Sequence, residues 1–424
     1  MNKKIFPLNK EELERIATKY PTPFYIYDER AMRENAMALR KAFSIFPTYK
    51  EHFAVKALPN PFVLKILAQE GLGADCSSYA ELFLAEIAGM RGESKMFTSN
   101  ETLSKDYDLA KKMGAIINLD DFSHIEFLER SVGLCELISC RYNPGPLKKG
   151  NAIIGKPEEA KYGFTRSQII EGFKVLKDKG VKRFALHCMV ASNELNLDYH
   201  IETARILFEL AAEIKETLKL RIEFINLGGG VGIPYKPEDT AIAWDSLALG
   251  IKKVYDEIIV KAGLDPLGIH TEYGRPITGP YGYLVSRAVH SKKIYRNYIG
   301  LDSCMADLMR PALYGSYHHI TVAGKEDAPL SEIYDVVGSL CENNDKFAIQ
   351  RQLPKIDVGE KDGDLVIIHD AGAHGRAMGF NYNGKLRCGE LLLRSDGSVL
   401  QIRRPETIED YFATLDTASI SDFK

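Results

Sequence analysis

The sequence lacks the features of a disulfide-bonded, membrane-spanning or nucleic-acid-binding protein. Its seven cysteines are scattered, without the paired spacing of a disulfide framework or the clustered spacing of a metal site, which indicates reduced thiols. No apolar run approaches the roughly 20 residues that cross a bilayer. The formal net charge is −3 and no basic tract alternates with aromatic residues, so nucleic acid is not an expected partner.

The remaining composition is that of an ordinary globular protein. Hydrophobic residues make up 45% of the chain and charged residues 27%. The 424 residues exceed what one hydrophobic core usually organises, which predicts two domains. Residues 1–7 carry positive charge but lack the apolar core of a signal peptide. Together with the unpaired cysteines, this predicts a cytoplasmic protein without a metal site.

The larger part of the chain alternates short β-prone runs with amphipathic stretches. Eight candidate strands lie at residues 53–56, 73–76, 96–99, 115–119, 137–142, 184–190, 224–227 and 268–272. Helical periodicity marks stretches between them, at residues 61–70, 79–90, 104–113, 167–179, 199–218 and 248–261. Eight strand–helix units favour a (β/α)8 barrel, the TIM-barrel fold of the α/β class, over an open sheet.

The pattern changes after Pro276, where short strands and turns dominate. Candidate strands follow at residues 282–291, 294–300, 333–337, 364–369, 390–393 and 399–404. Residues 23–28 also alternate like a strand, and we expect them to join this second domain. The sequence therefore predicts a barrel over residues 30–278 and a mostly-β domain, a sandwich or barrel, formed by residues 1–29 and 279–424.

One lysine stands in a context that suits covalent chemistry. Lys56 ends the apolar, β-prone run Phe53–Ala57, just before a Pro-Asn turn. Apolar surroundings disfavour the charged form of an ammonium group, and a partly neutral lysine is a nucleophile that forms a Schiff base with an aldehyde. The alternative is a lysine that caps a strand edge with its ammonium group in water.

Other candidate residues fall at the carboxyl ends of the predicted barrel strands, where barrel active sites lie. They are Asp75, His187, Met189, Gly228–Gly230 and Glu272–Arg275. A glycine-rich loop lets backbone N–H groups approach a phosphate, and the loops after the last two strands commonly bind one. A carboxylate such as Glu272, placed beside a pyridine nitrogen, keeps it protonated and makes the ring an electron sink. An ion pair between Glu272 and Arg275 is the alternative.

At these positions the chain resembles the fold-type III pyridoxal-phosphate decarboxylases, and among them the diaminopimelate decarboxylases most closely. The motifs that carry the resemblance appear in the family's order, at Phe53–Ala57, Gly73–Asp75, Leu227–Gly230, Glu272–Arg275, Arg310–Tyr314, Cys341–Glu342, Gly372–Ala373 and Asn381–Asn383. Jointly they are specific, although singly most are not. The resemblance implies a carboxy-lyase that uses pyridoxal 5'-phosphate and converts meso-diaminopimelate to L-lysine and carbon dioxide in lysine biosynthesis.

The resemblance also implies residue roles. Lys56 is similar to the lysine that binds the cofactor covalently, and Cys341 to the cysteine that returns a proton to the α-carbon. The implied cofactor-binding residues are Lys56, Asp75, His187, Met189, Ser192, Gly229, Gly230, Glu272, Gly274, Arg275 and Tyr382. The implied substrate-binding residues are Arg275, Arg310, Tyr314, Glu342 and Tyr382. In this family Cys341 and Glu342 reach the neighbouring subunit, which implies a homodimer with shared sites.

Simpler interpretations exist for some of these residues. Cys341 can be read as a small buried hydrophobic residue, like most free cysteines. Glu342 and Asp345 suit a solvated loop, and Arg310 before a proline suits the cap of a helix or loop. Their shared order in one family makes these interpretations together less favourable than the functional one.

The sequence departs from the family at several positions. The common pattern His-Ile-Gly-Ser-Gln is replaced by Met189–Asn193, and the family's first histidine there stacks on the cofactor ring. On a strand, residues 187 and 189 point to the same face. We therefore expect His187 one layer deeper in the barrel with Met189 nearer the ring, where either the sulfur of Met189 packs on the ring or the cofactor shifts. Further departures, expected close to the cofactor or substrate, are Ser78–Tyr79, Tyr273, Asn343 and His374.

Alternative functions stay open at this point. One is a related decarboxylase that acts on ornithine, arginine or a carboxylated polyamine such as carboxynorspermidine. Arg310 with Arg275 favours instead a substrate that carries a second, distal carboxylate. A different class is a non-catalytic pyridoxal-phosphate carrier, but such small carriers lack a second β domain. An enzyme similar to alanine racemase is a further alternative, but the catalytic tyrosine motif of such racemases cannot be identified in this sequence.

Overall fold

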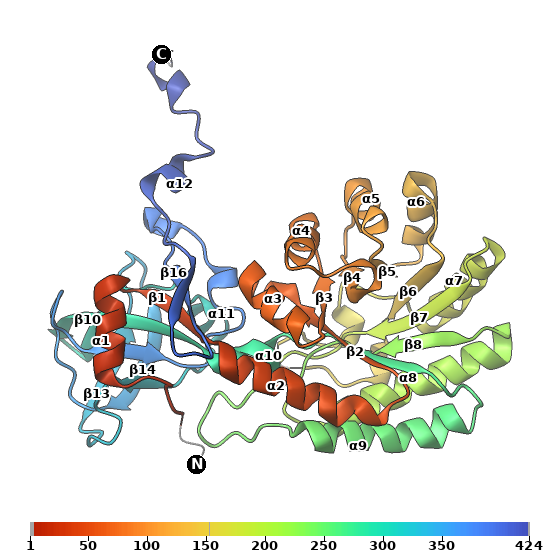
Figure 1. Cartoon of the computed structure of the whole chain (residues 1–424), viewed down its shortest axis with the longest axis horizontal. Helices are drawn as coiled ribbons and strands as arrows, with labels where there is room; N and C mark the ends of the chain where they lie inside the picture. The colour runs from red at the N-terminus through yellow and green to blue at the C-terminus, as the bar shows by residue number, and fades with distance from the viewer. Residues whose placement is uncertain (1–3, 152, 423–424) are drawn as a thin grey trace. The chain divides into compact units, whose positions relative to one another are not determined.

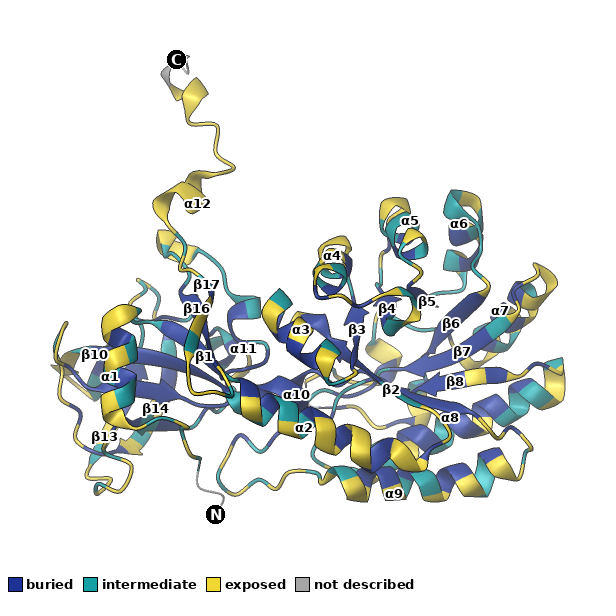
Figure 2. Ribbon diagram, in the orientation of Figure 1, coloured by how far each residue is buried: buried dark blue, intermediate teal, exposed yellow. Residues whose placement is uncertain are grey.

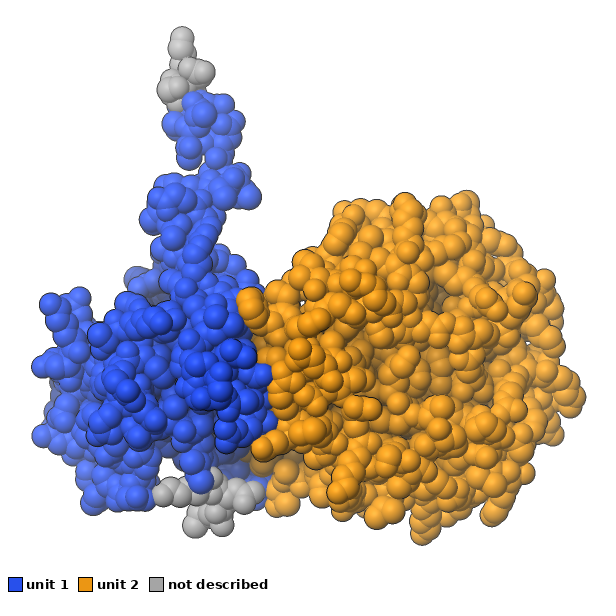
Figure 3. All heavy atoms as spheres, in the orientation of Figure 1, with its two compact units in different colours: residues 1–31, 235–239, 279–424 blue, residues 32–234, 240–278 orange. Residues whose placement is uncertain are grey.

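The computed structural model describes residues 4–151 and 153–422 of the chain. The chain divides into two compact units, drawn in different colours in Figure 3. Unit 1 consists of Met1–Ala31, Tyr235–Asp239 and Gly279–Lys424, and unit 2 of Met32–Pro234 and Thr240–Thr278. Residues 235–239 therefore group with unit 1, whereas the sequence places them in the barrel. The predicted domain limits otherwise stay a prediction.

Unit 2 is a closed barrel of eight parallel strands, as the alternating pattern predicts (Figure 1). Each strand pairs with its neighbours in chain order, and β2 closes the barrel against β9. The strands are β2 (Tyr49–Ala54), β3 (Gly73–Cys76), β4 (Lys95–Thr98), β5 (Ile116–Leu119), β6 (Leu137–Tyr142), β7 (Arg183–Cys188), β8 (Ile222–Asn226) and β9 (Gly268–Thr271). The (β/α)8 prediction is confirmed.

Helices form the outer layer of unit 2. They are α2 (Glu29–Ala42, whose first residues belong to unit 1), α3 (Pro61–Gln69), α4 (Tyr79–Ile87), α5 (Ser104–Lys112), α6 (Ser123–Val132), α7 (Arg166–Asp178), α8 (Leu197–Leu218) and α9 (Trp244–Tyr255). The short α10 (Arg275–Thr278) follows β9 and is buried. Local sequence signals start several of them: Asn60 caps α3 ahead of Pro61, and Thr165 caps α7 with a capping box. The sequence analysis did not find α2 or α6.

The barrel strands are buried on both faces. Every residue of β3, β4, β5, β6 and β9 is buried, which Figure 2 shows as dark blue strands beneath partly exposed helices. One cluster of buried apolar side chains joins the five consecutive strands β4 to β8, with members Met96, Ile116, Leu137, Ala185 and Phe224. A parallel sheet that helices cover on one side and a packed interior on the other requires such continuous apolar runs.

Five barrel strands end one or two residues earlier than predicted, and in three of them this moves a candidate residue onto a loop. Strand β2 ends at Ala54, so Lys56 lies in the 3-10 turn η2 (Val55–Ala57). Strand β7 ends at Cys188, ahead of Met189, and β9 ends at Thr271, ahead of Glu272. These residues still lie at the carboxyl ends of the strands, where barrel active sites are built.

Unit 1 is built on a nine-stranded sheet. Its strands are β1 (Phe24–Asp28), β10 (Gly282–Lys293), β11 (Asn297–Leu301), β12 (Ile320–Val322), β13 (Glu332–Val337), β14 (Lys346–Leu353), β15 (Leu365–Ile368), β16 (Gly389–Leu393) and β17 (Val399–Arg403). Strand β1 lies between β10, to which it is antiparallel, and β16, to which it is parallel. The prediction that residues 23–28 join the β domain is confirmed, whereas β12 and β14 were not predicted.

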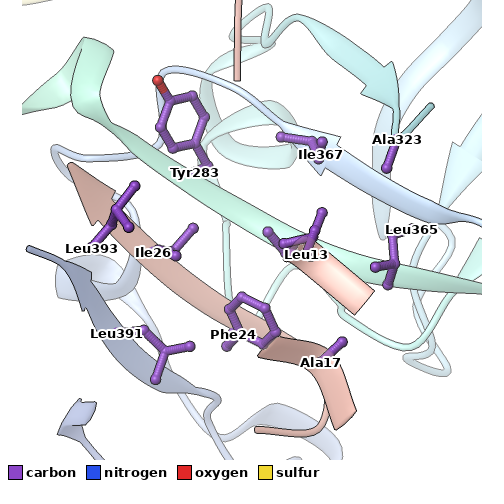
Figure 4. Close-up of a cluster of buried hydrophobic side chains, with 11 residues drawn as sticks. Leu13, Ala17, Phe24, Ile26, Tyr283, Ala323, Leu365, Ile367, Leu391 and Leu393 are labelled. Atoms are coloured by element: carbon purple, nitrogen blue, oxygen red, sulfur yellow. The ribbon is translucent and has the colours of Figure 1, made fainter. Parts of the chain in front are cut away.

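Helix α1 (Lys10–Lys19) closes one face of this sheet. Asn9 and Glu12 form a capping box that begins the helix. The helix places Leu13 and Ala17 against apolar side chains of β1, β10, β15 and β16, as the close-up in Figure 4 shows. The other members of this core are Phe24, Ile26, Tyr283, Val285, Ala323, Leu365, Ile367, Leu391 and Leu393.

Two short helices complete unit 1. Helix α11 (Arg310–Tyr314) begins at a sequence-predicted substrate residue, and α12 (Ile408–Phe412) follows β17. Across residues 4–151 and 153–422, we find no helix that is both long and apolar enough to cross a bilayer.

Candidate active site

The barrel end brings Lys56, Asp75 and Glu272 into one electrostatic cluster. Lys56 follows β2, Asp75 lies on β3 and Glu272 follows β9. The charge of Glu272 acts to raise the pKa of Asp75, and the charge of Lys56 acts to lower the pKa of both carboxyl groups. The side chain of Lys56 is exposed. The expectation that apolar walls surround its ammonium group is therefore wrong, because the 3-10 turn after β2 carries the lysine out of the strand. Its charge acts on three carboxyl groups, those of Asp75, Glu272 and Glu81.

Asp75 is a buried carboxyl group with an unsatisfied oxygen. Burial raises its pKa well above the usual range, and the nearby charge of Glu272 adds to this while Lys56 opposes it. Its Oδ1 has no hydrogen-bond partner among the described residues. A buried polar atom of this kind costs about 1–3 kcal/mol unless a partner is supplied. Asp75 therefore suits a ligand that brings its own polar or cationic group.

Two donors hold the carboxylate of Glu272 from neighbouring strands. His187 Nε2 on β7 lies 2.9 Å from one oxygen, and the amide Nδ2 of Asn226 on β8 donates to the other at 2.7 Å. Burial raises the pKa of Glu272, but His187, His52 and Lys56 outweigh it and the net pKa is lowered. The group is thus an ionised, oriented carboxylate at the carboxyl ends of the strands.

Asn226 links this carboxylate to the glycine-rich loop that follows β8. Its Oδ1 accepts the N–H of Gly228 at 2.8 Å, and the N–H of Glu272 donates to the carbonyl of Gly228 at 2.9 Å. The sequence analysis missed Asn226. The available signal is a polar residue in an otherwise apolar strand run, directly before the glycines.

Close packing of backbone explains the glycines of this loop. Gly228 has φ +68°, and a Cβ there would stand 2.2 Å from the carbonyl oxygen of Cys188. A Cβ on Gly229 would stand 2.5 Å from the carbonyl oxygen of Glu272, and one on Gly230 would stand 2.7 Å from that of Ala191. In the loop after β9, a Cβ on Gly274 would stand 2.8 Å from the Cβ of Ala57. The backbone here can approach a ligand as closely as it approaches its neighbours.

Met189 lies directly against this loop. The N–H of Gly229 donates to the sulfur of Met189 at 3.3 Å. The shared face predicted for residues 187 and 189 does not apply, because β7 ends at Cys188 and only His187 projects from the strand. His187 contacts Glu272, and the half-buried Met189 contacts the glycine loop. A thioether is a weak acceptor, which a phosphate oxygen can replace.

Ser192 and Arg275 meet on the same side of the barrel. Arg275 Nη2 donates to Ser192 Oγ at 3.3 Å. The N–H of Ser192 donates to Oδ1 of Asn151 at 3.1 Å, and Asn151 also donates to Glu194 at 3.1 Å. Asn151 thereby fixes the loop after β7, a role that no spacing in the sequence indicates.

Three departures from the family pattern make structural contacts of their own. Tyr273 donates its N–H to Glu51 at 2.7 Å, a bond that the family's proline cannot make, and its ring stacks on Trp244 at 5.4 Å. Ser78 caps α4 through its side chain, and Tyr79 packs on Phe83. These side chains thus have structural contacts, and the expectation that Tyr273 and Ser78–Tyr79 lie close to the cofactor or substrate stays a prediction.

Five candidate residues belong to unit 1. Arg310 is buried, with its guanidinium carbon 5.1 Å from the ring centre of Tyr235 and Nη2 donating to Ser316 at 3.2 Å. Tyr314 is exposed at the end of α11. The remaining three are Cys341, Glu342 and Tyr382, on the loop between β13 and β14 and on the 3-10 turn before β16.

The loop that carries Cys341 is fixed at both sides. The N–H of Cys341 donates to the side chain of Asn383 at 2.7 Å, which joins this loop to the turn that bears Tyr382. Buried Asp345 accepts the N–H groups of Met305 at 2.6 Å and Leu340 at 2.8 Å. The solvated-loop interpretation is wrong for Asp345. Cys341 is exposed, so the buried-hydrophobe interpretation is wrong as well.

The barrel residues fit pyridoxal phosphate. An accessible lysine suits its aldehyde, the ionised Glu272 suits a pyridinium nitrogen, and the crowded glycine loop suits a phosphate. The Oδ1 of Asp75, which has no hydrogen-bond partner among the described residues, suits a further polar group of the ligand. Within the described ranges we find no group of three or more His, Cys, Asp or Glu that could hold a metal ion.

Comparisons with known proteins agree with this geometry. The family model described as the pyridoxal binding domain of pyridoxal-dependent decarboxylases matches residues 30–279. Protein TabA of Pseudomonas amygdali pv. tabaci is 40% identical over 409 residues, covering 96% of this chain and 94% of that protein. The diaminopimelate decarboxylase of Methanothermobacter thermautotrophicus is 34% identical over 398 residues, covering 93% and 92%.

A solved structure extends the similarity to the whole fold. The crystal structure of diaminopimelate decarboxylase from M. jannaschii, in complex with L-lysine, matches with a TM-score of 0.88 at 26% identity. It covers 97% of this chain and 98% of that chain. The family match spans more than half of the sequence, and the resemblance predicted from the motifs is confirmed. The chain belongs to the pyridoxal-dependent decarboxylases.

Proposed function

We propose that this protein decarboxylates meso-diaminopimelate to L-lysine and carbon dioxide, with pyridoxal phosphate as cofactor, in lysine biosynthesis. The observation that carries the proposal is the cluster of Lys56, Asp75 and Glu272 at the barrel end, in a chain similar over nearly its full length to diaminopimelate decarboxylases. One of these relatives was solved with L-lysine, the product expected here.

The barrel residues would bind and orient the cofactor. When bound, pyridoxal phosphate accepts the electron pair of the bond that is broken. Lys56 would hold its aldehyde carbon, and the ionised Glu272, fixed by His187 and Asn226, would pair with its ring nitrogen. The glycine loop and Arg275 would bind its phosphate, and Met189 would exchange the Gly229 N–H for a contact with the cofactor.

The residues of unit 1 would recognise the substrate and supply a proton. Buried Arg310 offers a planar fork that suits a distal carboxylate, and Glu342 suits a distal ammonium group. Cys341 is exposed and carries a thiol that can donate a proton at the α-carbon. Tyr314 and Tyr382, both exposed, would add contacts to substrate and cofactor.

We further infer a cytoplasmic homodimer with shared active sites. Cys341 and Glu342 lie on a fixed, exposed loop of unit 1, as expected of residues that reach a partner subunit. Unpaired cysteines suit a reducing compartment. On this proposal, residues 30–278 form the cofactor-binding domain and residues 1–29 with 279–424 the β domain.

A panel of amino acids tests the reaction. Purified protein loaded with pyridoxal phosphate is given meso-diaminopimelate, ornithine, arginine, lysine or carboxynorspermidine, and carbon dioxide and the amine product are measured. We expect kcat/KM to be highest for meso-diaminopimelate, with L-lysine as product. A higher kcat/KM for any other compound contradicts the proposed substrate. If none of the compounds releases carbon dioxide, the proposed decarboxylation is contradicted.

A related decarboxylase with a different amino-acid substrate is the second candidate. It is favoured by one observation: Met189 stands beside the glycine loop where the family has a histidine. TabA, which is more similar to this chain than the Methanothermobacter enzyme is, has a name that states no reaction. The same panel separates the two candidates, since the second requires another compound to be preferred.

A further inference from the structure

The segment after β17 exposes apolar side chains in a continuous run. Every residue from Thr407 to Ile420 is exposed, as Figure 2 shows for α12 and the chain beyond it. The large apolar side chains of this run are Ile408, Tyr411, Phe412, Leu415 and Ile420. We refer to residues 407–420 as the arm. Contiguous exposed apolar groups mark an interaction surface more often than a free one.

The root of the arm is held firmly, so its direction of exit is defined. Glu406 accepts the backbone N–H of Arg387 at 2.9 Å and the side-chain amide of Asn381 at 2.7 Å, and it pairs with the guanidinium of Arg387. Thr407 then begins α12 with a capping box to Asp410, and Arg404 Nη2 pairs with Asp410 at 2.8 Å. These contacts fix the start of the arm although its side chains stay exposed.

The same root is joined to the loop that carries Cys341. Asn381, which binds Glu406, and Asn383, which binds the N–H of Cys341, belong to one short segment around Tyr382. The arm therefore grows out of the part of unit 1 that would face a partner subunit if Cys341 completes a neighbouring active site. This continuity favours a second copy of the chain as the molecule that covers the arm.

The charge of the arm argues against other occupants. Residues 407–420 contain three acidic residues and no lysine or arginine. An anionic membrane surface or a nucleic acid attracts segments rich in basic residues, and this segment has none. An apolar, acidic arm suits a protein surface instead.

We propose that residues 407–420 pack against a second copy of this chain and strengthen the homodimer. The inference rests on the proposed function, because it uses the expectation that Cys341 faces a partner. In a symmetric dimer each copy gives one arm and receives one, so the apolar side chains of both arms leave water on association.

Sedimentation equilibrium of the full chain tests the contribution of the arm. In the variant Ile408→Ser, Phe412→Ser, Leu415→Ser, we expect the dimer dissociation constant to rise by about tenfold or more, since three large apolar side chains lose their burial. The matched control, Ile87→Ser with Leu249→Ser, removes equally exposed apolar residues from α4 and α9, and its dissociation constant should equal that of the unmodified protein. An arm variant that dimerises as tightly as the unmodified protein overturns the proposal.

A cross-linking experiment locates the contact without weakening the dimer. A photoreactive phenylalanine analogue replaces Phe412, and equal amounts of isotopically light and heavy chains are mixed, exchanged and irradiated. We expect light–heavy cross-linked peptides that join position 412 to a second chain. Cross-links confined to one chain overturn the proposal.

The outcomes separate the arm from the proposed function. If the protein is monomeric at all concentrations, both the shared active site and the packing of the arm on a second copy are contradicted. If the arm variant weakens the dimer but the protein decarboxylates none of the tested amino acids, the packing of the arm on a second copy is supported and the proposed reaction is contradicted. An active dimer that is indifferent to the arm variant removes the arm alone.

Discussion

His187 Nε2 lies 2.9 Å from a carboxylate oxygen of Glu272, and both side chains are buried. With Asn226 donating to the other oxygen, the carboxylate cannot rotate without breaking a hydrogen bond. This pair is the structural basis for assigning Glu272 to the cofactor ring. On the proposed function, His187 would be a positioning residue, since it would act on the cofactor through Glu272.

We predict that Glu272→Gln keeps the cofactor bound at Lys56 but decarboxylates the preferred substrate about 100-fold more slowly or worse, because a neutral amide cannot stabilise a pyridinium. Absorbance of the bound cofactor and kcat measured on the same preparation check this. A variant with full activity would remove Glu272 from its assigned role.

Changing His187 should shift the pH dependence. His187 lowers the pKa of Glu272, so in His187→Phe that pKa rises and activity is lost at higher pH as the solution is acidified. His187→Gln keeps a donor and should restore part of the shift. The acidic limb of the kcat/KM profile is the measurement, and identical limbs in all three proteins would contradict the positioning role.

Lys56 should be the residue that holds the cofactor. Borohydride reduction of the loaded protein, followed by peptide mass spectrometry, should place the pyridoxyl adduct on Lys56. Lys56→Ala should retain no adduct after the same treatment. An adduct on another lysine, Lys148 for example, would sink the assignment.

Mixed dimers should recover activity if the site is shared. Lys56→Ala and Cys341→Ala proteins are each expected to be nearly inactive, but their exchanged mixture contains hybrids with one intact site. Random exchange makes half of the dimers hybrid, so about a quarter of the wild-type activity should return. Mixing two batches of Lys56→Ala is the control, and no recovery after confirmed exchange argues for independent sites.

Arg310→Lys should lower kcat/KM for meso-diaminopimelate by about 10- to 150-fold, the equivalent of about 1.5–3 kcal/mol, because lysine keeps the charge but loses the two-pronged contact. Arg351→Lys is a matched control, since Arg351 also stacks on a tyrosine of unit 1, with 4.0 Å to the ring centre. Equal effects of the two substitutions would mean that Arg310 has only a packing role.

Gly228→Ala should destabilise the barrel more than Gly180→Ala does. Both glycines have positive φ, +68° and +91°, so each alanine stores backbone strain of about 1–3 kcal/mol. Only the Cβ at position 228 meets another atom, 2.2 Å away, whereas position 180 has nothing within 4 Å. Chemical denaturation of both variants measures the difference, and equal losses would show that the loop after β8 can yield.

The barrel and the β domain could be predicted from the sequence because each depends on a regular alternation. The ends of strands could not. The apolar run through Val55 extends the predicted strand to Lys56, but the chain turns at Val55, where Leu58 donates to its carbonyl and Asn60 caps the next helix. Turn formation depends on those later residues, which a strand pattern does not weigh.

The polar partners inside the barrel were also beyond prediction. Glu272 was identified from its motif, yet Asn226, 46 positions earlier, became its partner only when β8 and β9 paired. Tyr273 was noted as a departure without its cause, since Glu51, which accepts its N–H, lies 222 positions away. Residues so far apart in the sequence become partners only when the barrel closes, so no local sequence pattern predicts these hydrogen bonds.

Strand β1 has a consequence for the order in which the chain folds. It pairs with β10 through Phe24–Tyr27 and Gly282–Val285 and with β16 around Leu391, so its partners leave the ribosome long after it does. The complete barrel is synthesised in between and can fold during translation while the buried face of β1 waits without a sheet. A chaperone that binds short apolar segments would find its target here, ahead of the barrel in the nascent chain, until the last strands are synthesised.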